Sequence, residues 1–409
     1  MKHRGILKTL ALFMVTTTLL KILTGCSRND EYDPIAPDLE NGNYSVNENN
    51  VRFLGRYYEN ENTGAVQFSW SNAGFTFRFY GTGIKAYLTL NTPPITLKAG
   101  DGTAFISVFV DDRTEPEDAH VLKLDQSKAW YTLIDGLEEG YHTLTVRKRD
   151  RGYFGILTGV AFGASELKVL GDHSSKAKLA AIPQSKDFRI EVIGDSISAG
   201  DGIYTEATYQ GLMSDGWSTY AAEAARLLDA DLNTIAISGN GLISSLFGDH
   251  LLDLPTQWPY IDAQIYQQKG KAVEWDFKKY QADVVIINLG TNDRAGVGPG
   301  KKFSLEAFEN EYVRFAEEIK SKYPDCIIIA CLGAMGDELK PQIENAIERV
   351  NRNSPEPYMY GEWFTPNPLK DGSSADNQHP SREAHRRYGR QLAERIQELT
   401  GRKITEKEE

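Results

Sequence analysis

The chain has 409 residues, of which 45 are Lys or Arg and 57 are Asp or Glu, so its formal net charge at pH 7 is −12. This acidic balance argues against a nucleic-acid partner, because phosphate binding depends on clustered Lys and Arg. The length exceeds the roughly 250–300 residues at which a single hydrophobic core stops growing, so we expect two domains.

Residues 1–25 have the composition of an export signal. A basic start precedes an apolar stretch at residues 10–23, which contains Lys21 and several threonines and is therefore a poor permanent membrane span. The stretch runs into Leu-Thr-Gly-Cys, which resembles the lipobox of bacterial lipoproteins, whose cysteine becomes the first mature residue and carries the lipid. We therefore expect an exported lipoprotein, anchored through acyl chains on Cys26 to the periplasmic or cell-surface face of a bacterial membrane. An ordinary secretory signal with an incidental cysteine is the alternative.

The next segments predict a tether, an all-β domain and a linker. Residues 26–50 are polar and predict a tether. In residues 51–165 apolar side chains alternate with polar ones, as from Val66 to Trp70, and turn pairs such as Asp101-Gly102 separate the runs. Short alternating strands of this kind predict a β-sandwich of the jelly-roll type. The mixed residues 166–187 predict a linker to the next domain.

Residues 188–400 predict a second domain, because apolar β-branched runs alternate there with helical repeats. The last repeat, from Ala384 to Ile396, follows a Pro-Ser start signal. Alternating strands and helices indicate a three-layer α/β domain around a parallel sheet. The apolar runs predict strands at 189–193, 233–237, 284–289, 327–332 and 358–363.

Two cysteines remain beyond Cys26, and they lie in or beside the predicted strand at 327–332. Cys326 and Cys331 are five residues apart, so their side chains point to opposite faces of the sheet and a disulfide between them is not expected. We expect two buried thiols that act as small hydrophobic side chains, and no metal site.

Four short segments carry residues suited to acyl transfer, and the first three follow predicted strands directly. In an open parallel sheet, ligands bind beyond the carboxyl ends of the strands, so residues far apart in sequence meet at one rim. The four segments are Gly194-Asp195-Ser196, Ser238-Gly239-Asn240-Gly241, Gly290-Thr291-Asn292-Asp293 and Asp376-Asn377-Gln378-His379. We expect them to form one site at that rim.

The residue types in these segments fit the parts of a serine esterase. Ser196 would be the nucleophile, and His379 would take its proton. Asp376, three residues before the histidine, would accept the other ring N–H and fix the tautomer. The backbone N–H of Ser196, the N–H of Gly239 and the side-chain amide of Asn292 are candidate oxyanion-hole donors, each worth roughly 3–4 kcal/mol in the transition state. This chemistry needs no cofactor.

Each segment also has a purely structural explanation. The glycines of the second segment fit a tight turn from strand to helix. Thr291-Asn292-Asp293 fits a helix cap, and a histidine before a helix is commonly a surface residue. The order of the four segments and their places at strand ends favour the catalytic interpretation.

Taken together, the segments resemble the four blocks of the SGNH (GDSL-like) hydrolases. The resemblance covers residues 188–398 and implies a flavodoxin-like α/β fold with the roles named above. In some members of that family the histidine leans on a backbone carbonyl, but Asp376 stands at the required offset here, so a full triad is expected. The second block reads Ser-Gly-Asn-Gly, where relatives are expected to carry a basic residue between the glycines. That departure leaves Gly239 and Gly241 as alternatives for the oxyanion N–H, and we choose Gly239.

A jelly-roll domain before an SGNH domain resembles carbohydrate esterase family 2, and with it the similarity extends over residues 50–398. That family implies removal of acetyl groups from plant polysaccharides or oligosaccharides, so an acetylated glycan is the expected partner. Trp217, Trp258 and Tyr260 would form a sugar-stacking rim, with core or interface packing as the alternative. The rival functions are a lipase or esterase that acts on lipid or other acyl esters, and a non-catalytic glycan-binding surface lipoprotein that works through its β-sandwich.

Overall fold

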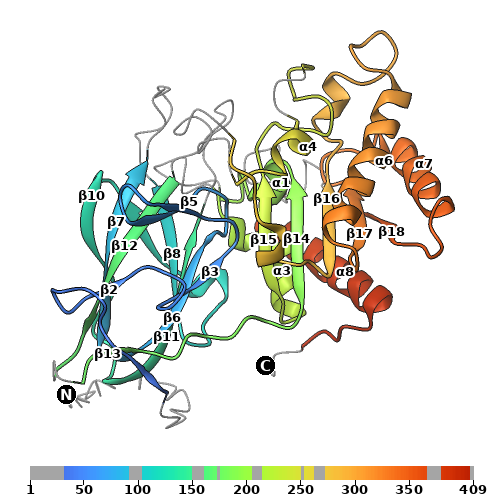
Figure 1. Cartoon of the computed structure of the whole chain (residues 1–409). Coiled ribbons are helices and arrows are strands. Elements are labelled where there is room, and N and C mark those ends of the chain that lie inside the picture. Colours follow the sequence, from blue (N-terminus) through green and yellow to red (C-terminus); the bar gives the residue numbers. More distant parts are fainter. Residues whose placement is uncertain are drawn as a thin grey trace, which may run out of the picture. The chain divides into compact units, whose positions relative to one another are not determined.

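The computed structural model describes residues 32–91, 104–149, 161–172, 176–204, 214–249, 253–261, 272–365 and 379–405. These residues form an antiparallel β-sandwich followed by a parallel α/β domain (Figure 1), which confirms the predicted fold class. The predicted signal segment with Cys26, and the predicted acid Asp376, lie outside the described residues. In the part of the chain that is described, no helix has both the length and the apolar composition needed to cross a membrane.

The sandwich consists of two antiparallel sheets. One has the strand order β1-β13-β6-β11-β8-β9, with β3 also paired to β6, and the other has the order β10-β7-β12-β5-β4, with β2 paired to β12. The strands are β1 (Pro34–Ile35), β2 (Tyr44–Ser45), β3 (Arg52–Leu54), β4 (Tyr58–Asn60), β5 (Ala65–Phe68), β6 (Gly74–Gly81), β7 (Gly83–Asn91), β8 (Ala104–Val110), β9 (His120–Leu124), β10 (Lys128–Ile134), β11 (Gly140–Lys148), β12 (Ala161–Leu170) and β13 (Lys178–Ala180). Strands β1 and β2 lie in the predicted tether, and part of β12 and all of β13 lie in the predicted linker. The sandwich is therefore longer than the sequence pattern predicts.

Alternating apolar side chains build the core of the sandwich. Phe75, Phe77 and Phe79 of β6 point to the same face of their sheet and are fully buried. Phe68 of β5, in the opposite sheet, packs on Phe75 with ring centroids 5.8 Å apart and on Phe162 with centroids 5.1 Å apart. Each such side chain contributes roughly 1.5–3 kcal/mol by leaving water, so this aromatic layer holds the two sheets together.

The second domain is built on a parallel sheet of order β15-β14-β16-β17-β18. Its strands are close to the predicted ones: β14 (Arg189–Gly194), β15 (Asp231–Ala236), β16 (Val284–Asn288), β17 (Ile327–Leu332) and β18 (Met359–Trp363). The α-helices are α1 (Ser196–Ala199), α3 (Tyr220–Leu227), α4 (Leu254–Gln257), α6 (Leu305–Lys322), α7 (Lys340–Arg352) and α8 (Arg382–Thr400). Short 3-10 helices are η1 (Pro116–Asp118), η2 (Gly216–Ser218), η3 (Phe277–Lys279) and η4 (Asp293–Ala295). Near-continuous apolar runs suit strands that are covered on both faces.

Different pairs of helices cover the two faces of this sheet. Val284 and Ile286 of β16 belong to a core that includes α3 and α8, whereas the alternate residues of β16 belong to a core that includes α6 and α7. Cys326 and Cys331 fall into these opposite cores as buried free thiols, so the prediction that they are buried on opposite faces of the sheet is confirmed.

Strand β14 occupies the topological switch point of the sheet. The chain passes from β14 to β15 on one side and then to β16 on the other side. Gly194, the last residue of β14, is level with Ala236 of β15 and Asn288 of β16. The three segments that follow these strands therefore leave the sheet side by side, at the place where open α/β sheets bind ligands.

A buried ion pair joins the sandwich to the α/β domain. The Nη2 of Arg56, from the sandwich, lies 3.6 Å from Oε2 of Glu191 in β14, and both side chains are fully buried. Glu191 also accepts hydrogen bonds from Trp258 Nε1 (2.6 Å) and from the Tyr323 hydroxyl (3.0 Å). Removing one partner of such a pair leaves a buried charge uncompensated, at a cost of about 3–5 kcal/mol. The stability of the α/β domain is therefore linked to the sandwich.

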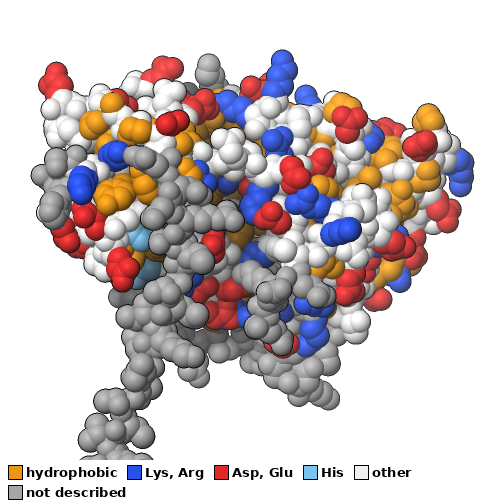
Figure 2. Space-filling model, turned by 90° about the horizontal axis from the view of Figure 1, so that it is seen from below, with side chains coloured by type: hydrophobic (Ala, Val, Ile, Leu, Met, Phe, Trp, Pro, Cys, Tyr) orange, Lys and Arg blue, Asp and Glu red, His pale blue; other side chains and the backbone are white. Residues whose placement is uncertain are grey.

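The described surface carries charges of both signs. On the face in Figure 2, Asp and Glu side chains lie among Lys and Arg side chains and apolar patches. On α6, Arg314 pairs with Glu311 and with Glu318 one turn away on either side. Exposed pairs of this kind contribute little to stability, and here they keep the local charge mixed.

Candidate active site

The first segment forms a sharp turn that presents the serine at the start of α1. Asp195 caps this helix, because its Oδ1 accepts a hydrogen bond from the N–H of Ile197 at 3.0 Å. Ser196 is the first residue of the helix and is 6% exposed. A Cβ at Gly194 would lie 2.1 Å from Oγ of Ser198, so only glycine fits under the turn. The local packing therefore places Ser196 directly beyond the end of β14.

The two glycines of the second segment are required for different reasons. Gly239 has φ +78°, a left-handed conformation that favours glycine. A Cβ at Gly241 would lie 2.4 Å from Oδ2 of Asp293, so this residue is small because a carboxylate packs against it.

The direction of the peptide between Asn240 and Gly241 separates the two candidate donors. The carbonyl of Asn240 accepts a hydrogen bond from Asn292 Nδ2 at 2.7 Å, so it points toward that amide. In a trans peptide the following N–H, which belongs to Gly241, points the opposite way. Donors of an oxyanion hole must converge, so this geometry favours Gly239, whose role stays a prediction.

Asn292 of the third segment reaches back to the other two segments. It stands at the N-cap position of η4, yet its side chain makes no capping hydrogen bond, so the helix-cap explanation does not hold for it. Its Nδ2 instead donates to the Asn240 carbonyl at 2.7 Å and to Oδ2 of Asp195 at 3.3 Å. The amide predicted to serve the oxyanion hole is therefore held beside the nucleophile turn.

Asp293 anchors the second segment, a role that the sequence did not predict. Its buried carboxylate accepts hydrogen bonds from three consecutive N–H groups, those of Leu242 (2.8 Å), Ile243 (2.8 Å) and Ser244 (3.0 Å). Burial raises the pKa of Asp293 to about 6, and these N–H groups act in the opposite direction. The signal in the sequence is a carboxylate directly after the asparagine, in a segment that follows a largely apolar strand.

His379 lies half-buried shortly before α8, whose N-cap is Ser381. Burial raises the pKa of the Asp195 carboxyl to about 7, while the N–H of Ile197 and the charge of His379 act in the opposite direction. His379 is thus within electrostatic range of the nucleophile turn. Its predicted partner Asp376 lies outside the described residues, so the triad stays a prediction.

A second histidine supports the site from behind and was also missed by sequence analysis. His385 is fully buried, and its Nδ1 accepts a hydrogen bond from the N–H of Tyr220 at 3.2 Å. Burial lowers the pKa of His385 to about 3, so the ring is neutral at ordinary pH. The Tyr220 hydroxyl in turn lies 2.8 Å from Oγ of Ser198 in α1. This chain of contacts fixes α1 against α3 and α8.

The predicted sugar-stacking rim is wrong for both tryptophans. Trp258 has no exposed surface, because it packs in the core and donates its Nε1 hydrogen to Glu191. Trp217 is 7% exposed, and the guanidinium of Arg147 lies 3.9 Å from the centroid of its ring. For these two residues the packing alternative holds. Tyr260 is half-buried, and its part in substrate binding stays a prediction.

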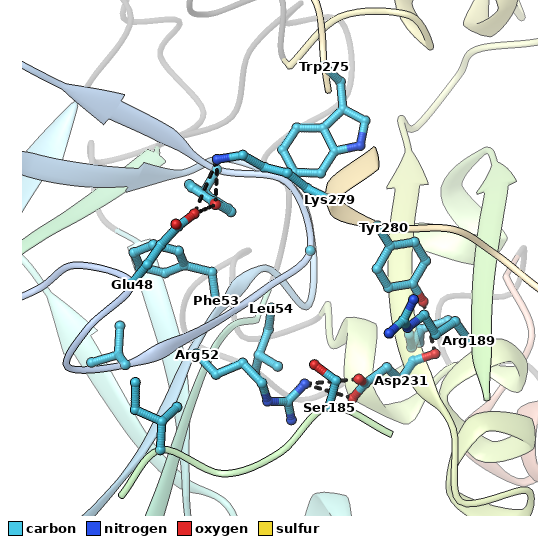
Figure 3. Close-up of a pocket in the computed structure, with 15 residues that line it drawn as sticks. Glu48, Arg52, Phe53, Leu54, Ser185, Arg189, Asp231, Trp275, Lys279 and Tyr280 are labelled. Atoms are coloured by element: carbon cyan, nitrogen blue, oxygen red, sulfur yellow. Dashed lines mark hydrogen bonds and ion pairs between the residues drawn. The ribbon is translucent and has the colours of Figure 1, made fainter. Parts of the chain in front are cut away.

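A cavity of about 370 Å³ lies at the amino ends of the strands, which we call the amino edge of the sheet, away from Ser196 at the carboxyl edge. Its lining includes Arg189 and Asp231, the first residues of β14 and β15, and Arg52 from the sandwich (Figure 3). In open parallel sheets the amino edge is not where substrates bind. Among the described residues, no group of three or more His, Cys, Asp and Glu side chains is placed to hold a metal ion.

Comparison with known proteins agrees with this architecture. Residues 192–403 match the GDSL-like Lipase/Acylhydrolase family, and residues 53–166 match the Carbohydrate esterase 2 N-terminal family. The chain is 28% identical over 362 residues to the cellulase/esterase CelE of Acetivibrio thermocellus, a match that covers 86% of this chain but 40% of CelE. It is 23% identical over 358 residues to an acetylxylan esterase / glucomannan deacetylase of Cellvibrio japonicus, covering 85% of this chain and 88% of that protein.

A solved structure matches over both domains. A family two carbohydrate esterase from Clostridium thermocellum, solved in complex with cellohexaose, has a TM-score of 0.71 and 26% sequence identity, and the match covers 86% of this chain and 99% of that one. The chain spans less than half the length of CelE, so the match concerns one part of that larger protein. The hydrolase match covers more than half of the chain, and the sandwich match precedes it. The chain therefore belongs to the GDSL-like lipase/acylhydrolase family and, through its N-terminal domain, to carbohydrate esterase family 2.

Proposed function

We propose that the protein is a carbohydrate O-acetyl esterase that removes acetyl groups from plant cell-wall polysaccharides or oligosaccharides. The observation that carries the proposal is the contact of Asn292 with the turn that presents Ser196 at the switch point of the sheet, with His379 within electrostatic range of that turn. Relatives named as an acetylxylan esterase / glucomannan deacetylase, and as a family two esterase in complex with cellohexaose, support the choice of an acetylated glycan.

The reaction begins with attack on the acetyl carbonyl by the Ser196 hydroxyl oxygen, as His379 takes the proton. The carbonyl oxygen becomes an oxyanion, which the N–H of Ser196, the N–H of Gly239 and the Asn292 amide stabilise. The bond to the sugar oxygen breaks, and His379 returns its proton to the leaving sugar hydroxyl. Water, activated by His379, then attacks the acetyl-enzyme and releases acetate.

The described residues also bear on the rival functions. A lipase needs a long apolar groove for its acyl chain, whereas the acetyl group needs only a small pocket beside the oxyanion hole. A pure glycan-binding protein has no use for an asparagine amide held 3.3 Å from the aspartate next to a serine at a strand end. The second consideration favours an esterase over a binding protein, and the first makes the preferred length of the acyl chain the property that separates an acetyl esterase from a lipase.

The substitution Ser196→Ala tests the proposal. We expect it to abolish acetate release from acetylated xylan and p-nitrophenol release from p-nitrophenyl acetate, by a factor of roughly 10⁵–10⁶ in kcat. Ser198→Ala, which removes a buried hydroxyl from the same helix, is the matched control and should keep kcat within about tenfold of wild type. Turnover retained by Ser196→Ala would contradict the proposal, and a preference for p-nitrophenyl octanoate over the acetate ester would favour the lipase.

A further inference from the structure

We propose that Asp195 is a positioning residue for the oxyanion hole, because its carboxylate holds the Asn292 amide beside Ser196. The inference rests on the proposed function, since an oxyanion donor needs an ester substrate. It assigns a task to a residue that is itself neither the nucleophile, the base nor a predicted donor.

The two oxygens of Asp195 are used by two different segments. Oδ1 accepts a hydrogen bond from the N–H of Ile197 at 3.0 Å, and Oδ2 accepts one from Asn292 Nδ2 at 3.3 Å. The side chain has no exposed surface, so both contacts are shielded from water. One carboxylate thus joins the first turn of α1 to the loop that carries Asn292, and it sets the distance between nucleophile and amide.

Asn292 has a second anchor on the opposite side. Its Nδ2 donates to the Asn240 carbonyl at 2.7 Å, the shorter of the two contacts. The amide is therefore fixed by a strong contact to the second segment and a longer contact to Asp195. The hydrogen in the longer contact is the more weakly bound of the two, so an oxyanion can share it with Asp195 while the amide keeps its orientation.

A carboxylate is the side chain that this position requires. An ionised carboxylate only accepts hydrogen bonds, so it can face two N–H donors at once. Asparagine at position 195 would place an NH₂ group against one of those two donors. Asp195→Asn is therefore a substitution of nearly equal shape that breaks one of the two contacts.

The charged groups around Asp195 connect this arrangement with pH. Burial raises the pKa of Asp195 to about 7, with Asp293 and Asp201 acting in the same direction and His379 in the opposite one. A protonated Asp195 has one acceptor oxygen fewer, so the hold on Asn292 weakens as the pH falls below this value. In wild type, kcat should therefore fall as Asp195 is protonated. The part of the pH dependence that is due to Asp195 should be absent from Asp195→Asn.

A double-mutant cycle in kcat tests the inference, with p-nitrophenyl acetate as the probe. We expect Asp195→Asn to lower kcat roughly 10- to 100-fold with KM within about threefold, because the amide is misplaced but not removed. Asn292→Ala should lower kcat roughly 10²- to 10³-fold. If Asp195 acts through Asn292, the double variant should be no slower than Asn292→Ala by more than about threefold. Costs that multiply in the double variant would overturn the inference.

Asp215→Asn is the matched control for the cycle. Asp215 is also buried and also caps a short helix, but its carboxylate accepts from the N–H of Trp217 at 3.1 Å and from the hydroxyl of Ser218 at 2.8 Å, in a different segment from Asn292. We expect it to lower the melting temperature while kcat stays within about threefold of wild type. An equal loss of kcat in Asp215→Asn would overturn the inference, because general loosening would then explain both variants.

A variant that does not fold and a wild type without activity would have different meanings. If Asp195→Asn does not fold, Asp195→Ser replaces it in the cycle, because serine still caps the Ile197 N–H but is too short to reach Asn292. Wild-type protein without activity on any acetyl ester would contradict the proposed function itself. Active wild type with an additive cycle would contradict only the role of Asp195.

Discussion

The amino ends and the carboxyl ends of the parallel strands form two polar edges of the sheet. The charged side chains at these two edges are compensated in different ways. At the amino edge, in the cavity of Figure 3, Arg52 donates to both oxygens of Asp231, at 3.0 and 2.9 Å, and Lys279 pairs with Glu48 at 3.2 Å. At the carboxyl edge, the carboxylates of Asp195 and Asp293 are held by backbone and amide N–H groups. Opposite charges therefore neutralise each other at one edge, whereas carboxyl groups with raised pKa values gather at the other.

Charge compensation therefore locates the site better than the presence of a cavity does. A cavity whose cations and carboxylates satisfy each other offers a ligand little that it does not already have. Carboxyl groups with pKa values near 6 and 7, buried next to a serine, are the kind of perturbed groups that gather at functional sites. Substitutions at each edge test this contrast.

Among the substitutions that compare the two edges, the largest effect is expected from the predicted acid of the triad. Asp376→Asn should lower kcat roughly 10³- to 10⁴-fold on p-nitrophenyl acetate, because the histidine loses the group that sets its tautomer and stabilises its imidazolium. Such a loss would assign a third carboxylate, that of Asp376, to the site at the carboxyl edge. Asn377→Ala, at the neighbouring position, is the control and should leave kcat within a few-fold of wild type. A rate for Asp376→Asn within tenfold of wild type would reduce the machinery to a Ser–His dyad.

The sequence predicted those parts of the molecule that depend on local pattern. The predicted bounds of strands β14 and β16 agree with the structure to within one residue, because short segments rich in Val and Ile have few alternatives in a protein of this kind. The three strand-end segments were placed together correctly, because parallel strands of one sheet share their carboxyl edge.

Parts that depend on distant partners were not predictable. Trp217 and Trp258 stand in segments that read as loops, but residues far away in sequence pack against their rings, among them Arg147 on Trp217 and Phe315 on Trp258. The short strands β1 and β13 exist because they pair with each other and β13 with β6, not because of their own alternation. The role of Asp293 likewise depends on N–H groups that come close to its carboxylate only in the folded protein.

A medium effect is expected on the pH dependence of stability at Asp293. Its folded-state pKa of about 6 lies above the ordinary value of 3.8, so the native state keeps this proton at pH values where the unfolded chain has lost it. The associated stability is full below about pH 4 and is lost as the pH rises to about 6. The loss is on the order of 3 kcal/mol in the free energy of unfolding, at about 1.4 kcal/mol per pKa unit.

Urea unfolding from pH 4 to 7 measures this effect as a difference between wild type and Asp293→Asn. The variant has no proton to lose, so its free energy of unfolding should fall less over this range than that of wild type. Asp195 titrates in both proteins, and Asp293 contributes to its raised pKa, so the difference reports the titration of Asp293 together with its coupling to Asp195. Parallel curves for the two proteins would show that Asp293 is ionised throughout, and the contrast between the two edges would then depend on Asp195 alone.

The smallest effect is expected at the amino edge, where Arg52→Ala removes a cation from β3 that faces Asp231 on β15. Partly exposed pairs contribute about 1 kcal/mol or less, and Asp231 keeps its hydrogen bond from the N–H of Lys186 at 3.0 Å. We expect the free energy of unfolding to fall by about 1 kcal/mol and kcat to stay within twofold, with the more exposed pair of Arg113 and Asp118 as a control in Arg113→Ala. A loss of kcat above tenfold in Arg52→Ala would mean that the sandwich transmits its position through the length of β15 to the segment with Gly239. The two edges would then be coupled, and the charge pairs of the cavity would contribute to catalysis from the opposite side of the sheet.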